Sequence, residues 1–240
     1  FSCGEAACWD LHGFNRLGGN SVAETVVSGM LVAEYVSDYC DSQESNIDIS
    51  TNLIETFIKC EQDKLDELLE PKENPEDGYK LRARMEDIMM DKVGIFRNGK
   101  DLEEAVNELE ELIVRSRNIE VKAKTLTANP ELFNAYRTQR MLKLAICTAK
   151  GALDRKESRG AHSREDYPER NDAEYLNRTI TTWPDPTQTT PTVTYENIDI
   201  NEMEMPPGFR GYGKDMTIHH DDSAIRQDAV DKIREELEAE

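Results

Sequence analysis

The residues best suited to chemistry stand close together near the start of the chain, between Arg16 and Ser21. The planar guanidinium of Arg16 carries a fork of donors that matches a carboxylate in two parallel hydrogen bonds. Gly18 and Gly19 lack side chains, so the backbone can bend sharply there and a flat ligand can lie against it. Asn20 or Ser21 can cap a following helix, and the free amides of that helix suit an anion or a group that becomes anionic.

The element that must position these residues is the apolar segment that follows them. Apolar side chains recur there with few breaks, at Val22, Val26, Val27, Met30, Leu31 and Val36. This pattern predicts a helix that is buried on most of its sides. By itself, a Gly-Gly-Asn-Ser string before a helix is typical of an ordinary tight turn with a helix cap. The stretch becomes specific only through its longer context.

Composition excludes several classes of protein. The chain has 240 residues, of which 38% are hydrophobic, and a formal net charge of -20. This length suits one or two domains, and the negative charge disfavours nucleic acid and anionic membrane surfaces as direct partners. No apolar run has the length of a membrane-spanning helix, so we expect no direct membrane insertion. The five cysteines form no C-x-x-C pair, and we predict no metal site.

The middle of the chain predicts a helical bundle. A polar run over residues 37–50 is typical of a surface loop, and apolar residues then keep helical spacing in four stretches, which begin near Thr51, Leu81, Asn98 and Pro130. Four helices with short connections imply a bundle with crossing angles of roughly 20° that is stabilised by the burial of apolar faces.

The segment Arg155–Arg170 interrupts the helical pattern because it places arginines beside carboxylates. Bidentate pairs of this density usually join one domain to another. The alternative, a second anion site formed by Arg159 and His162, is weaker. After Trp183, prolines exclude continuous helix and Thr192–Glu196 alternates like a strand.

Two long motifs resemble one known family. They are the string HGFNRLGGNS at residues 12–21, preceded by Gly4-Glu5, and the string ESRGAHSRED at residues 157–166. The first resembles the carboxyl-terminal flavin-contacting segment of succinate dehydrogenase and fumarate reductase flavoprotein subunits, and the second resembles another signature of this family. The helical middle and the tail are most similar to the quinol:fumarate reductase branch. The resemblance therefore extends over essentially the whole chain.

The resemblance implies FAD as cofactor and a dicarboxylate, fumarate or succinate, as substrate. It implies that Glu5 hydrogen-bonds the sugar-like chain of the flavin and that Asn20, Ser21 and Val22 contact the cofactor. The backbone amides of Ser21 and Val22 would face the pyrimidine end of the ring. Arg16 matches the arginine that clamps a substrate carboxylate. No catalytic residue is implied within the chain, because the proton-donating arginine would lie upstream of it.

The resemblance also predicts how the chain is divided into domains. We predict a mainly α fold with a small α+β part, in which residues 1–48 end a flavin-binding domain, residues 49–165 form a helical bundle domain and residues 166–240 form a small mixed domain. The chain contains no G-x-G-x-x-G motif to hold the cofactor's diphosphate. We therefore expect a carboxyl-terminal part of the subunit that is inactive alone.

The partners implied by the resemblance are an iron-sulfur subunit and a membrane subunit that binds haem and quinone. They imply a peripheral position on the cytoplasmic side of the inner membrane. An alternative from another class is a free-standing acidic helical interaction module without catalysis.

Overall fold

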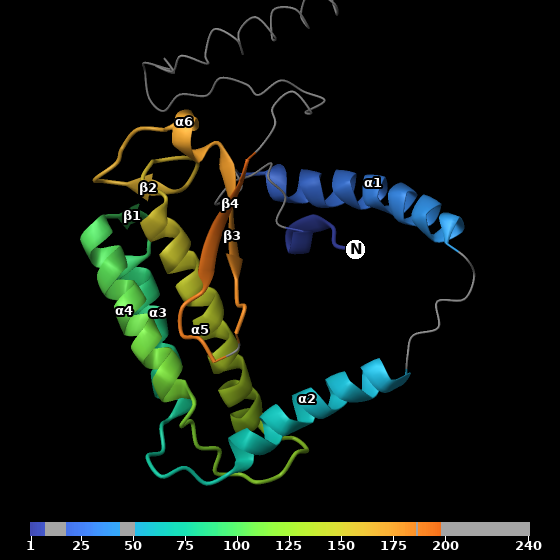
Figure 1. Cartoon of the computed structure of the whole chain (residues 1–240), viewed down its shortest axis with the longest axis vertical. Helices are drawn as coiled ribbons and strands as arrows, with labels where there is room; N and C mark the ends of the chain where they lie inside the picture. Colours follow the sequence, from blue (N-terminus) through green and yellow to red (C-terminus); the bar gives the residue numbers. More distant parts are fainter. Residues whose placement is uncertain (8–17, 44–50, 186, 198–240) are drawn as a thin grey trace, which may run out of the picture. The chain divides into compact units, whose positions relative to one another are not determined.

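The computed structural model describes residues 1–7, 18–43, 51–185 and 187–197 (Figure 1). Contacts divide the chain into one compact unit of Phe1–Glu169 with Thr181–Val193, and a second unit of Arg170–Ile180 with the residues from Thr194 onward. The described elements are mostly helices, which confirms the predicted mainly α fold: η1 Gly4–Ala7, α1 Asn20–Ser42, α2 Thr51–Leu69, α3 Gly78–Lys92, β1 Phe96–Arg97, α4 Gly99–Ser116, α5 Pro130–Asp154, β2 Ser163–Arg164, α6 Asp172–Tyr175, β3 Asn177–Thr182 and β4 Thr192–Asn197. The predicted domain boundaries stay predictions.

Helices α3, α4 and α5 pack side by side into a bundle (Figure 1). Each begins where a short polar side chain accepts hydrogen bonds from amides of the first turn: Asp77 for α3, Asn98 for α4 and Asn129 for α5. Pro130 occupies the first turn of α5, where its missing N–H costs nothing. The helix starts predicted near Asn98 and Pro130 are confirmed, whereas α3 begins at Gly78 and not at the predicted Leu81.

The core of the bundle consists of aliphatic side chains from all three helices. The largest of the fully buried ones are Leu81, Ile88, Leu102, Leu109, Leu142 and Ile146, none more than 1% exposed. Full burial of one such side chain contributes about 1.5–3 kcal/mol. The core is therefore the main source of stability for this unit.

Helix α2 does not pack along the bundle, so the predicted four-helix arrangement is wrong for the described residues. Its last turns reach the core through Leu65, Leu68 and Leu69. Four apolar residues of its first half, by contrast, are between 47% and 65% exposed: Leu53, Ile54, Phe57 and Ile58. The apolar spacing identified a helix and its apolar side, but spacing carries no information on which element covers that side.

A polar contact also joins α2 to α5. The Tyr136 hydroxyl and the Arg140 guanidinium, both on α5, donate hydrogen bonds to the Glu61 carboxylate on α2. Hydrogen bonds from Lys64 and then Tyr136 lower the pKa of Glu61 to about 2. The contact therefore holds the C-terminal half of α2 to the bundle.

Helix α1 differs from the sequence prediction in two ways. It continues to Ser42, through residues that were predicted to be loop. Its apolar side is also exposed, with Val22 72%, Val26 56% and Met30 67% accessible, so the predicted burial is wrong for the described chain. The buried residues of this helix are the polar pair Glu24 and Ser28, which share a hydrogen bond of 3.1 Å. No described helix is long and apolar enough to cross a membrane.

Two short sheets complete the described structure. Strands β1 and β2 are parallel, with Phe96 opposite Ser163 and Arg97 opposite Arg164. Strands β3 and β4 pair into a second two-stranded sheet, and β4 confirms the strand predicted around Thr192–Glu196. The sequence also predicts a charged helix from about Ser223 to Glu240, but these residues lie outside the described part of the structure.

Candidate functional site

The turn before α1 has the conformation that its glycines allow. Gly19 immediately precedes the helix with φ of 83°, in the left-handed region that favours glycine. Because the residue at the cap position has no side chain, it cannot accept hydrogen bonds from the first amides of the helix. The first turn also holds no acidic residue. The partial positive charge of this helix end is therefore not offset by a carboxylate in that turn.

The short helix η1 lies against the first turns of α1. A Cβ on Gly4 would lie 3.6 Å from Cγ2 of Thr25, so the Gly4 backbone lies beside the Thr25 side chain. The Thr25 hydroxyl in turn donates a hydrogen bond of 2.8 Å to the Ser21 carbonyl. The backbone of Glu5, next to Gly4, therefore lies close to the first turns of α1.

The structure thus brings together most, but not all, of the residues predicted for this site. Asn20, Ser21 and Val22 form the first turn of α1, where Asn20 and Val22 are exposed and Ser21 is half-buried. Glu5 belongs to η1, although its side chain lies outside the described part of the structure. Arg16 also lies outside the described residues. The ligand contacts of all five residues remain predictions.

A second polar cluster is buried where the segment after α5 meets β1. Arg97 and Arg164 are each 2% exposed, Glu157 is fully buried and His162 is 5% exposed. The Arg164 guanidinium donates to the carbonyls of Ala152 at 2.8 Å and Leu153 at 3.0 Å, so it caps the carboxyl end of α5. A double hydrogen bond from Arg164 lowers the pKa of Asp166 to about 2.

The contacts of His162 determine its protonation. Nε2 lies 3.1 Å from the Arg155 carbonyl, which can only accept, so this nitrogen carries the proton. Nδ1 lies 2.8 Å from Nη1 of Arg97 and must accept. Burial, and then the charges of Arg97 and Arg164, lower the pKa of His162. The ring is therefore a neutral link between a charged donor and a backbone acceptor.

The described pairs of this cluster fasten residues 155–166 to one another, to α5 and to β1. That the cluster joins one domain to another stays a prediction. Arg159 is engaged by two hydrogen bonds to Glu157, at 2.7 and 3.0 Å, so the described geometry does not favour a second anion site. Sequence reasoning missed Arg97, because a single arginine between two helices gives no periodic signal.

Comparison with known proteins identifies the family. The sequence profile described as fumarate reductase flavoprotein C-term matches residues 82–212, more than half of the chain. The chain belongs to this family.

Individual relatives agree with this assignment. The fumarate reductase flavoprotein subunit of Helicobacter pylori is 56% identical over 214 residues, which cover 89% of this chain and 30% of that protein. The succinate dehydrogenase flavoprotein subunit of Bacillus subtilis is 31% identical over 89% of this chain and 36% of its own length. A solved E. coli quinol fumarate reductase chain superposes with a TM-score of 0.73 at 30% identity and covers 87% of this chain and 34% of that one. The chain therefore spans about a third of the length of these relatives.

The family is one of flavoproteins, and its cofactor is FAD. The turn before α1 fits such a group in two respects. A Cβ built on Gly18 or on Gly19 would meet no atom of the described residues within 4 Å, so none of these residues covers the backbone there. The uncapped helix end offers amides and positive potential to a ring that becomes more negative on reduction. The residues present are therefore compatible with one edge of a flavin.

Proposed function

We propose that this chain is the flavin-contacting and helical part of an FAD-dependent fumarate reductase or succinate dehydrogenase, which interconverts fumarate and succinate. When bound, FAD supplies hydride transfer to or from the dicarboxylate. The observation that carries the proposal is the turn at Gly19, where a left-handed glycine opens α1 without a side-chain cap. This turn occurs in a chain that is 56% identical to a fumarate reductase flavoprotein subunit.

Each predicted site residue has a physical role in this proposal. The amides of Ser21 and Val22 donate to the pyrimidine edge of the flavin and stabilise its reduced, more negative form. Asn20 contacts the cofactor beside them, and Glu5 accepts a hydrogen bond from the sugar-like chain. Arg16 holds one substrate carboxylate with both arms of its guanidinium, which orients the dicarboxylate over the ring.

The proposal extends to partners and place. Electrons are exchanged with an iron-sulfur subunit and then with a membrane subunit that binds haem and quinone. The subunit is peripheral, on the cytoplasmic side of the inner membrane. The alternative of a free-standing acidic module is less well supported, because it does not explain the 56% sequence identity to an enzyme subunit over 89% of the chain.

The test uses a subunit of the relatives' full length that contains this sequence. Arg16→Lys keeps the charge but loses the fork, so two parallel hydrogen bonds become one flexible contact. A hydrogen bond to a charged group contributes about 1.5–3 kcal/mol. The kcat/KM for fumarate should therefore fall by roughly ten- to several hundred-fold. The flavin-to-protein ratio should stay unchanged.

The matched control is Arg82→Lys, on the exposed side of α3, where Arg82 pairs with Glu86. It should leave turnover and flavin content unaltered. Normal kinetics in the Arg16 variant would remove this residue from the substrate site. Loss of flavin together with activity would instead make Arg16 a cofactor or folding residue.

The chain alone should neither bind flavin nor turn over fumarate. It lacks a G-x-G-x-x-G diphosphate-binding motif, and one carboxylate with two amides does not offset the cost of ordering a free cofactor. Purified chain incubated with FAD and passed through a desalting column should be colourless. Flavin absorbance at near one per chain would contradict this expectation.

A further inference from the structure

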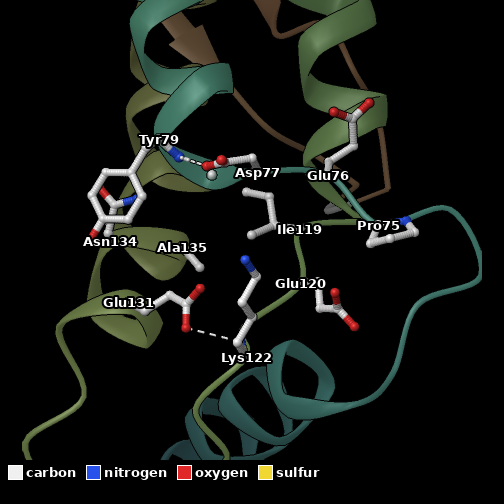
Figure 2. Close-up of a pocket in the computed structure, with 11 residues that line it drawn as sticks. Pro75, Glu76, Asp77, Tyr79, Ile119, Glu120, Lys122, Glu131, Asn134 and Ala135 are labelled. Atoms are coloured by element: carbon white, nitrogen blue, oxygen red, sulfur yellow. Dashed lines mark hydrogen bonds between the residues drawn. The ribbon is translucent and has the colours of Figure 1, made fainter.

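A cavity of about 420 Å³ lies where the loop before α3, the loop after α4 and the amino end of α5 meet (Figure 2). Its walls are fixed by a backbone bridge between the two loops. The Glu76 amide donates to the Asn118 carbonyl at 2.8 Å, and the Glu120 amide donates to the Glu76 carbonyl at 3.0 Å. The cavity is therefore framed by ordered backbone.

Asn134 on α5 lines this cavity and has no hydrogen-bond partner for its side chain among the described residues. Only 9% of the residue is exposed. Its amide is nevertheless open to the cavity, because Thr138 Oγ1 is the one fully buried side-chain polar atom without a partner among the described residues. Gly78 leaves the amide accessible, because a Cβ there would lie 3.3 Å from Nδ2 of Asn134. A ligand that enters the cavity can form hydrogen bonds with this accessible amide.

The charges around the cavity favour a cation. Four acidic residues line it, Glu76, Asp77, Glu120 and Glu131, and one basic residue, Lys122. Arg115 neutralises Glu76 through a 2.7 Å ion pair. Asp77 and Glu131 accept hydrogen bonds from neighbouring backbone amides, which leaves their negative charge in place. An anionic ligand would therefore be repelled from this cavity.

Lys122 already places a cation in this space. Figure 2 shows its side chain extending toward Ile119, between the two loops and α5. Its ammonium forms no ion pair within the described part of the chain, and the residue is exposed. A flexible exposed lysine can move aside for a ligand that makes better hydrogen bonds.

The remaining walls suit a planar group on an apolar stem. Tyr79 is 55% exposed, while Ile119 and Ala135 provide aliphatic surface. A guanidinium stacks on an aromatic ring, donates to carboxylates and an amide oxygen together, and is less strongly hydrated than an ammonium. We propose that this cavity binds the guanidinium of an arginine side chain on a partner polypeptide. A chain with a net charge of -20 attracts basic partners, which supports a polypeptide source.

The proposal does not depend on the flavin site, and small probes test it on the chain itself. N-acetylarginine amide, N-acetylcitrulline amide and N-acetyllysine amide would be titrated into ¹⁵N-labelled chain and followed by amide chemical shifts. The arginine probe should shift the amides of Gly78, Ile119 and Asn134. The citrulline probe has the same shape without the charge, and it should bind at least about tenfold more weakly, as should the lysine probe.

Two variants in the cavity should change the affinity in opposite directions. Asn134→Leu keeps the volume but removes the amide, so arginine binding should weaken by about tenfold while the thermal midpoint does not fall. Lys122→Met removes the competing cation and should tighten binding by about threefold or more. Lys124→Met, a lysine outside the cavity lining, is the matched control and should leave affinity unchanged.

Several results would overturn the proposal. Equal binding of the arginine and citrulline probes would exclude recognition of the charge. An unchanged affinity in both cavity variants would place the probe elsewhere. Butylguanidinium that binds as tightly as the arginine amide would indicate a free small molecule as ligand and would exclude the polypeptide source.

Discussion

Helices α1 and α5 are both long and apolar, yet they differ in what covers them. The α5 side chains Leu142 and Ile146 are fully buried, whereas Val26 and Met30 of α1 are more than half exposed. In α5 the apolar side meets α3 and α4 of the same bundle. In α1 the described chain offers no comparable partner for the valines. Apolar periodicity therefore predicts which side of a helix is apolar. That side is buried only where another element packs against it.

The largest expected effect sharpens this contrast. Leu109→Ala in the bundle core should lower the free energy of unfolding by about 2–5 kcal/mol, because it leaves a cavity among close-packed neighbours. Val26→Ala on α1 should change it by no more than about 0.5 kcal/mol, because the side chain is already half in water. Urea titrations would measure both changes in the free energy of unfolding. The comparison requires equal m-values for the parent chain and the two variants. Similar losses in the two variants would show that α1 is covered in solution.

The next effect concerns the polar cluster at the end of the bundle. The pKa of His162 is lowered from 6.5 in the folded chain, so on acidification the unfolded chain takes up this proton first. The stability contributed by the neutral ring is therefore present above pH 6.5 and is lost progressively as the pH falls below it. Because one proton is involved, the free energy of unfolding changes with pH by at most about 1.4 kcal/mol per pH unit.

His162→Gln is the variant that isolates this effect, because glutamine does not titrate and also offers a donor group and an acceptor. Its stability should vary less between pH 7 and pH 5 than that of the parent chain. The lowered pKa of Asp166 acts in a separate window, since its contribution is present above pH 3.8 and is lost as the pH falls toward about 2. Identical pH profiles for the parent and variant would contradict a neutral buried ring.

The smallest effect compares the two kinds of helix cap. Asn129→Ala removes the side-chain cap of α5 and should cost about 1 kcal/mol. Gly19→Ala forces a side chain into the left-handed region at a cost of about 1–2 kcal/mol, and this strain falls on α1. Hydrogen exchange of the α5 amides should therefore accelerate in the first variant and not in the second. Acceleration in both would mean that α1 and the bundle unfold together.

These comparisons also explain how much the sequence could predict. The helix starts at Asn98 and Asn129 follow from local capping chemistry, and a local rule can be read from neighbouring residues. The splayed first half of α2 could not be predicted, because periodicity does not name the covering element. The burial of Arg97 depends on a strand pair with a distant segment. The turn at Gly19 was predicted as a sharp bend, but its position beside η1 required the structure.

The parallel pair of β1 and β2 has a consequence for the order of folding. It joins residues about 65 positions apart, as the contact between Arg97 and His162 shows, and such distant closure is entropically costly before the intervening helices are in place. Helices α3 and α4 are neighbours in sequence and can associate first. We expect the strand pair to form after the main folding barrier. Variants that weaken it should then speed unfolding and leave the folding rate almost unchanged.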